Sequence, residues 1–210
     1  MQYIKHPRQI EDNSFIIIDD IIKQTHPDYQ FVDRVQAAVI KRVIHTTADF
    51  EWLTLLHFTS DAIEQIQQGI RAGCTLYTDT TMAMSGINKR RLAEYGCECR
   101  CYVSDNDVAQ HAKEAQITRS MAAVDKALTE EGEKIFVFGN APTALFRLLE
   151  QSEKPRAVVG VPVGFVGAAE SKEALVNSQL TGIASIGRKG GSNVAAAIIN
   201  AIIYQMDKEA

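Results

Sequence analysis

Arg42 and His45 are the two side chains of this sequence whose types and spacing are best suited to chemistry. Residues 33–45 are predicted to form a helix capped by Asp33, so side chains three positions apart share one face and can contact one ligand. His45 lies near the predicted C-terminus, where free carbonyl oxygens favour the imidazolium, whereas Arg42 opposes it by like-charge repulsion. A ligand carboxylate, or Asp49, would restore the protonated form. Such a histidine suits general acid catalysis near neutral pH.

This spacing does not by itself separate catalysis from a structural role, because a histidine at a helix end more often caps the helix than reacts. His57 and His111 have no comparable neighbours, and we expect both to be structural. The chain shows no Ser-His-Asp or H-E-x-x-H pattern, so neither a serine hydrolase nor a metalloprotease is indicated.

The four cysteines raise the question of a metal or redox site. Cys97, Cys99 and Cys101 alternate, so on a strand they would point to one face. No C-x-x-C pair occurs, and Cys74 does not supply a second pair at the usual ligand spacing. Free cysteine also packs as a small apolar side chain in reduced compartments. We therefore expect structural packing, with no metal site.

Glycine-rich or polar segments follow several predicted strands, at residues 79–81, 139–142, 164–167 and 187–192. Glycine lets backbone N–H groups approach a ligand closely, and the N-terminus of a following helix favours an anion. Together the segments predict an anion-binding rim, although each alone could be only a tight turn. No G-x-G-x-x-G follows a strand and no P-loop occurs, so a nucleotide cofactor is not indicated.

The elements that position these residues alternate between strands and helices from about residue 73 onward. Apolar runs of strand length are found at residues 75–78, 100–104, 134–139, 156–163 and 182–186. Helical patterns are found at residues 87–95, 118–130, 143–151, 171–178 and 193–206. This alternation predicts an α/β three-layer sandwich with a mostly parallel, five-stranded, flavodoxin-like sheet. The first 72 residues are predicted to be mainly helical, with a short strand at residues 53–58.

Size and composition predict one domain, residues 1–210, with enough apolar material for a sizeable core. The chain is 46% hydrophobic and 23% charged, and its formal net charge is −4. An acidic surface argues against nucleic-acid and anionic-membrane partners. The N-terminus lacks the pattern of a secretory signal, and the apolar run at residues 15–22 is interrupted by Asp19 and Asp20. We expect a cytoplasmic protein.

Five segments spread over the chain resemble the precorrin-8X methylmutase family, also called cobalt-precorrin-8 methylmutases. They are I-E-x-x-S-F at residues 10–15, KRVIH at 41–45, GNAPTALF at 139–146, GVPVGFVGAAESK at 160–172 and GRKGGS at 187–192. The resemblance covers nearly the whole chain in order. It implies an isomerase of corrin-ring (cobalamin) biosynthesis that moves a methyl group from ring position 11 to position 12 of (cobalt-)precorrin-8 to give a cobyrinate.

The resemblance also implies roles for particular residues. The family histidine falls on His45, as proton donor or acceptor to the macrocycle, and the substrate contacts fall on Ser14 and Arg42. It implies a flavodoxin-like fold and a homodimer with pockets near the subunit interface. Arg119 and Arg188 are weaker candidates for contacts with substrate carboxylates, since either could be ordinary surface charge. We expect the segment 118–120 to reach the partner's pocket.

The residues fit this reading independently. Glycine-lined helix N-termini and arginines can hold a tetrapyrrole polycarboxylate, and an isomerisation needs neither a metal nor a nucleotide cofactor. Two alternatives remain. The first is a non-catalytic corrinoid or polycarboxylate carrier, against which the pairing of His45 with Arg42 argues. The second is a phosphate-binding α/β domain, against which the missing phosphate-loop spacings argue.

Overall fold

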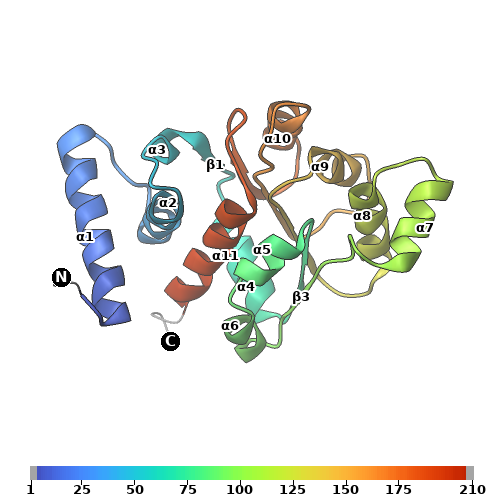
Figure 1. Cartoon of the computed structure of the whole chain (residues 1–210), viewed down its shortest axis with the longest axis horizontal. Helices are drawn as coiled ribbons and strands as arrows, with labels where there is room; N and C mark the ends of the chain where they lie inside the picture. Colours follow the sequence, from blue (N-terminus) through green and yellow to red (C-terminus); the bar gives the residue numbers. More distant parts are fainter. Residues whose placement is uncertain (1–3, 207–210) are drawn as a thin grey trace.

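The computed structural model describes residues 4–206, in which one sheet is covered by helices on both faces (Figure 1). The strands are β1 (Leu56–Phe58), β2 (Thr75–Thr78), β3 (Glu98–Arg100), β4 (Lys134–Phe138), β5 (Ala157–Gly160) and β6 (Gly182–Ser185). The helices are α1 (Pro7–Thr25), α2 (Arg34–Thr47), α3 (Trp52–Leu55), α4 (Ala62–Arg71), α5 (Thr81–Gly86), α6 (Lys89–Glu94), α7 (Asn106–Glu114), α8 (Arg119–Thr129), α9 (Pro142–Leu149), α10 (Ala168–Val176) and α11 (Ser192–Met206).

The sheet has the strand order β1-β6-β5-β4-β2-β3. Strands β2 to β6 are parallel, whereas β1 pairs antiparallel with β6 at one edge, with Leu56 opposite Ser185. Counted among themselves, the five parallel strands follow the order 2-1-3-4-5 that is typical of flavodoxin-like sheets. The predicted fold class is confirmed.

The central strand β4 divides its side chains between two layers of helices. Ile135 and Val137 pack into the cluster that includes α2, α4 and α11, whereas Phe136 and Phe138 pack with α8, α9 and α10. This alternation follows from the two-residue period of a strand. All five residues of β4 are buried, as expected for a parallel strand with both faces covered.

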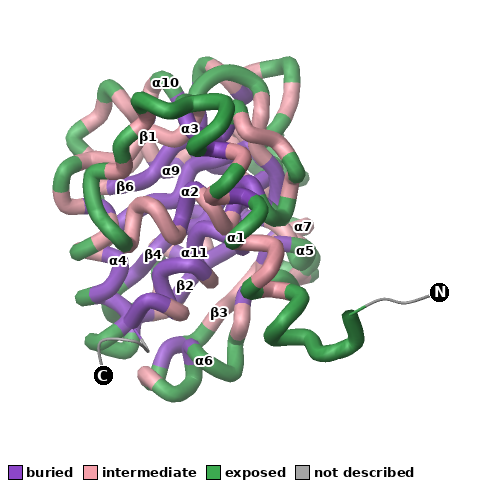
Figure 2. Tube along the Cα trace, turned by 90° about the vertical axis from the view of Figure 1, so that its left-hand side faces the viewer, coloured by how far each residue is buried: buried purple, intermediate pink, exposed green. Residues whose placement is uncertain are grey.

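Helix α11 joins the N-terminal helices to the sheet. Its residues are buried on almost every side, because α2 packs on one side of it and the central strands lie on the other. Helix α1 packs mainly on α2 and is the outermost element at that end of the molecule (Figure 1). Viewed from the α1 side, exposed segments surround a buried interior (Figure 2). No helix within residues 4–206 is both long and apolar enough to cross a bilayer.

Several elements differ from the prediction. The strand expected at residues 100–104 is β3, which begins at Glu98 and ends at Arg100, because it pairs only with the short stretch of β2 from Thr75 to Tyr77. Of the strand expected at residues 53–58, only the last three residues form β1, because residues 53–55 belong to α3, and the described sheet has six strands rather than five. Helices α5 and α7 were not predicted as separate elements.

Candidate active site

The C-terminal turn of α2 presents His45 to solvent. The helix begins as predicted, because one carboxylate oxygen of Asp33 accepts hydrogen bonds from the backbone N–H groups of Val35 (2.7 Å) and Gln36 (2.8 Å). It ends at Thr47, and the following residue, Ala48, has a left-handed φ of 53° and donates its N–H to the carbonyl of Ile44. A residue with left-handed backbone cannot continue a right-handed helix, so the conformation of Ala48 fixes the end of α2.

Two aromatic side chains and a carboxylate surround the pair formed by Arg42 and His45. The His45 ring stacks on Phe15 of α1, with ring centroids 5.3 Å apart and planes 20° apart. The Arg42 guanidinium carbon lies 4.8 Å from the centre of the Phe15 ring and 5.2 Å from that of Tyr204 in α11. One of its nitrogens is 2.7 Å from a carboxylate oxygen of Glu11. Stacking and ion pairing thus hold both groups in place.

A pocket of about 250 Å³ opens beside His45, between α2, the end of α5 and α11. Its lining residues are Arg42, His45, Thr46, Gly86, Asn193, Ala196, Ala197 and Asn200. The Asn200 amide is already engaged, since it donates to the Gly86 carbonyl and accepts from the N–H of Asn88 (both 2.8 Å). Arg42 therefore supplies the cationic group of this pocket beside the His45 imidazole, and the Asn200 hydrogen bonds hold its opposite wall.

Ser14 precedes Phe15 in the middle of α1, but neither pocket beside Arg42 includes it in its lining. Its hydroxyl donates to the carbonyl of Ile10 (2.8 Å), one helical turn earlier. This is the usual back-bond of a serine inside a helix. A substrate contact from Ser14 therefore requires the hydroxyl to rotate away from its own helix.

Asp49, which the sequence suggested as a partner that would favour the protonated form of His45, pairs with a lysine instead. Its carboxylate lies 2.5 Å from the ammonium nitrogen of Lys189, which is also 3.0 Å from Glu51. The hydrogen bond from Lys189 lowers the pKa of Asp49, so its charge is committed to that pair. The contact ties the loop between β6 and α11 to the segment that follows α2.

Three backbone N–H groups of the predicted anion-binding rim are already bound to a carboxylate of the protein, that of Asp79. The Asp79 carboxylate, at the end of β2, accepts hydrogen bonds from the backbone N–H groups of Gly139 (3.0 Å), Asn140 (2.7 Å) and Ala141 (2.6 Å). Burial raises the pKa of Asp79, while these three N–H groups lower it. The expectation that this loop binds a ligand anion is therefore wrong for these three amides. A carboxylate directly after a strand was the sequence signal for this contact.

A buried lysine, Lys172, is hydrogen-bonded to the loop between β6 and α11 that carries Arg188. Lys172 of α10 has no exposed surface, and its ammonium donates to the carbonyl of Lys189 (2.8 Å), as does the Ser185 hydroxyl (2.8 Å). Burial lowers the pKa of Lys172 to about 8. A side chain at Gly190 would meet the carbonyl oxygen of Val161 at 2.1 Å, so only glycine allows this close approach.

Arg119 and Arg188 are both exposed, and neither lines the pocket beside His45. The Arg188 guanidinium carbon lies 5.8 Å from the centre of the Phe165 ring, which is itself 86% exposed. Arg119 begins α8, on the opposite face of the sheet from α2 (Figure 1). Within one chain, the fold does not bring Arg119 to His45.

The cysteines and the other two histidines singled out in the sequence do not line the pocket beside His45. Cys97 donates to the carbonyl of Ile70 at 3.2 Å, Cys99 packs against the core, and burial raises the pKa of Cys99 to about 12. Only Cys99 lies within β3, so the three alternating cysteines do not share one strand. His111 lies 3.4 Å from Asp125, and His57 lies within β1. Among residues 4–206, no three histidine, cysteine or acidic side chains form a group that could hold a metal ion.

Similarity to known proteins extends over nearly the whole chain. The family model described as precorrin-8X methylmutase matches residues 9–205, a range that includes Ser14, Arg42, His45, Arg119 and Arg188. A cobalt-precorrin-8 methylmutase of Salmonella typhimurium is 62% identical over 207 residues, covering 98% of this chain and 99% of the relative. One from Priestia megaterium is 44% identical over 205 residues, covering 96% and 89%.

The likeness also holds in three dimensions. A crystal structure of precorrin-8x methyl mutase from Thermus thermophilus superposes with a TM-score of 0.86. The two sequences are 35% identical, and the alignment covers 96% of this chain and 97% of that one. The sequence and fold comparisons therefore agree.

Proposed function

The chain belongs to the precorrin-8X methylmutase family, isomerases of cobalamin biosynthesis, and we propose that His45 exchanges the proton that drives its methyl shift. The methyl group moves from ring position 11 to position 12 of the precorrin-8 macrocycle. Substrate and product of an isomerase contain the same atoms, so the ring must lose one proton for each proton that His45 donates, and we assign His45 as the acceptor of that proton. Protonation draws electrons from the conjugated ring and weakens the bond to the migrating methyl group.

The observation that carries this proposal is the position of the His45 imidazole. It is exposed and stacked on Phe15 while lining a pocket together with Arg42. Histidine is the side chain whose charge most readily changes near neutral pH. A carboxylate of the substrate bound by Arg42 would bring negative charge near the imidazole and favour its protonated form.

We assign substrate binding to Arg42, which lines the pocket with His45, to Ser14, one residue before the Phe15 that stacks on His45, and to Arg188 in the loop between β6 and α11. An arginine can bind a carboxylate through two parallel hydrogen bonds, and the macrocycle carries several carboxylates. The relatives from Salmonella typhimurium and Priestia megaterium are named for cobalt-precorrin-8. We therefore assign the cobalt-containing macrocycle as substrate, with cobalt as part of the substrate and not as a resident metal.

Conversion of cobalt-precorrin-8, followed by absorption spectroscopy, tests the assignment. The wild type should shift the spectrum of the substrate to that of a new chromophore. His45→Ala should retain its fold and bind the substrate, giving a static shift only, because an acid is lost and no core group is. Conversion by His45→Ala at the wild-type rate would contradict the role of His45. A static shift with the wild type would instead favour the carrier.

A homodimer completes the proposed site. Arg119 begins α8, on the opposite face of the sheet from its own His45. Helix α1 carries three exposed apolar side chains that a second copy could cover, namely Ile10, Ile16 and Ile17, each at least 46% accessible. Twofold symmetry would produce two equivalent pockets from one contact. The segment 118–120 is our candidate for the part contributed across the interface.

Mixing two variants tests whether the pocket is shared. His45→Ala and Arg119→Ala are unfolded and refolded together, so that heterodimers form. If each pocket uses residues of both chains, one site per heterodimer is intact and activity exceeds that of either parent. If Arg119→Ala alone is inactive and the heterodimers are inactive as well, Arg119 acts on the pocket of its own chain. Full activity of Arg119→Ala would mean that Arg119 is an ordinary surface charge that does not contact the substrate.

A further inference from the structure

A second pocket, larger than the one beside His45, lies between α1, α2 and α11 and encloses about 470 Å³. Three alanines, one isoleucine and two aromatic side chains form its apolar lining: Ala37, Ala38, Ala201, Ile16, Phe15 and Tyr204. Arg42 lines both pockets, so the two adjoin at this side chain. Small side chains between aromatic rings leave room for a flat ligand, and the volume is within the range of ligand sites.

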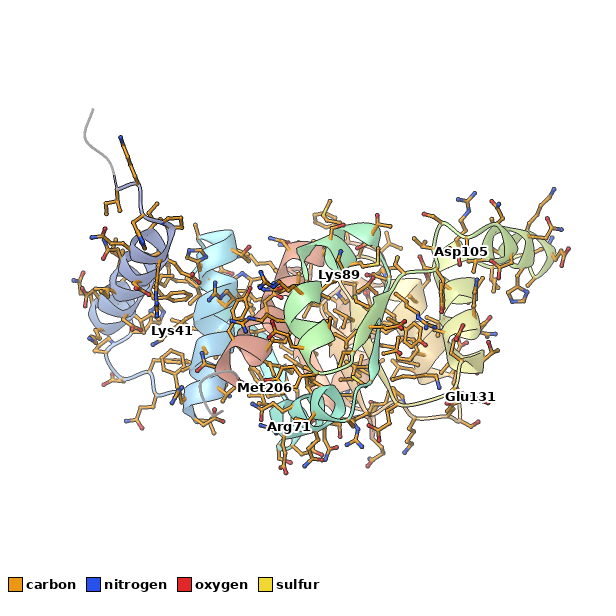
Figure 3. The ribbon with its side chains drawn as sticks, turned by 90° about the horizontal axis from the view of Figure 1, so that it is seen from below. Lys41, Arg71, Lys89, Asp105, Glu131 and Met206 are labelled. Atoms are coloured by element: carbon orange, nitrogen blue, oxygen red, sulfur yellow. The ribbon has the colours of Figure 1, made fainter. Side chains whose placement is uncertain are left out.

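The cations of this pocket come from the same face of α2 as His45. Arg34, Lys41 and Arg42 line it, and at 3.6 residues per turn these three and His45 fall within about a third of the helix circumference. From Arg34 to His45 the face extends over about 16 Å. Lys41 lies where α2 faces α1 (Figure 3). A single macrocycle with carboxylates around its edge can reach several of these groups together.

Each of these cations contacts a side-chain oxygen of the protein, and for Lys41 and Arg42 that oxygen belongs to a carboxylate, the group that the substrate carries. Lys41 lies 2.5 Å from a carboxylate oxygen of Asp19, in the same helix as Glu11, which pairs with Arg42. Among the described residues, Arg34 donates to the neutral amide oxygen of Gln205, at 3.3 Å. The Asp19 side chain is 38% exposed, and pairs this accessible to water are weak. A substrate carboxylate can therefore replace Asp19 at small cost.

We propose that Arg34 and Lys41 bind carboxylate side chains of the macrocycle, and that Asp19 occupies Lys41 when the substrate is absent. The ring then lies along α2, with its reacting edge at His45 and its far carboxylates at Lys41 and Arg34. This inference rests on the proposed function, because it takes the substrate to be the tetrapyrrole polycarboxylate. It adds two binding residues and a competing carboxylate to that site.

Steady-state kinetics with three variants tests the proposal. Lys41→Gln and Arg34→Gln should each raise KM about tenfold, because a charge-assisted contact is lost, while kcat changes little. Asp19→Asn should lower KM about two- to fivefold, because the competing charge is removed. Lys41→Arg keeps the charge and should bind as the wild type does. Lys113→Gln, an equal loss of charge on α7, is the matched control and should leave KM unchanged.

The opposite signs at Lys41 and Asp19 separate binding from a structural role. If the pair only holds α1 against α2, both substitutions raise KM, and that result overturns the proposal. So does a KM within twofold of the wild type for both Lys41→Gln and Arg34→Gln. Failure of the wild type to convert cobalt-precorrin-8 would contradict the proposed function instead. Affinity of the same variants for the product cobyrinate, measured by absorbance, would then still decide the binding site.

Discussion

Replacing Lys172 by methionine is expected to stabilise the fold, because the lysine keeps a charge where no water reaches it. The side chain has no exposed surface, and burial lowers its pKa from 10.5 to about 8. That difference corresponds to about 3 kcal/mol of cost for the charged form at neutral pH. Methionine has a similar length and no charge, and buried charges replaced by apolar groups often leave proteins more stable.

The hydrogen bond that Lys172 makes reduces this gain. Methionine cannot donate to the carbonyl of Lys189, but that carbonyl keeps its bond from the Ser185 hydroxyl (2.8 Å). One lost hydrogen bond costs about 1 kcal/mol. The expected net gain in the free energy of unfolding at pH 7 is therefore about 1–3 kcal/mol, a rise of roughly 2–10 °C in Tm for a chain of this size.

Urea unfolding between pH 7 and pH 10 measures this effect. The folded pKa of Lys172 lies below the unfolded value, so between about 8 and 10.5 the unfolded state holds a proton that the folded state lacks. The wild type therefore gains stability from this group as the pH rises through that window, and its deficit relative to Lys172→Met shrinks. Lys113→Met, on exposed α7, should show no such trend. A Lys172→Met protein that is less stable at every pH would refute the reasoning.

Three further outcomes follow from the contacts of the site. Arg42→Ala should weaken substrate binding about tenfold or more through loss of a charge-assisted contact, and an unchanged Kd at constant salt would place Arg42 outside the substrate site. Asp79→Asn should lower the free energy of unfolding by about 3 kcal/mol, because an amide cannot accept all three N–H bonds; denaturation within 1 kcal/mol of the wild type would contradict this. Turnover should persist after exhaustive chelation of free metal and desalting. If the activity is lost and returns only when a metal or a nucleotide is added, the protein uses a cofactor that the sequence did not reveal.

Features that depend on residues close together in the chain could be predicted from the sequence. The cap at Asp33 and the helix that places Arg42 three residues before His45 arise from contacts within a few positions. The alternation of apolar strands with helices also predicted the parallel sheet, because such crossovers are right-handed and cover both faces. The family resemblance added what no local pattern contains, namely the substrate and the reaction.

Tertiary structure alone decided which charged groups meet. The Asp79 carboxylate accepts the N–H groups of Gly139, Asn140 and Ala141, which lie 60 or more residues later in the chain. Asp49 is bound by Lys189, 140 residues later, and not by His45. Periodicity indicates which face of a helix or strand is buried, but not which distant residue lies opposite it. The burial of Lys172, an expensive position for a cation, could not be expected from its residue type. Those pairings depend on how the crossovers bring loops together at one edge of the sheet, which no short segment of sequence determines.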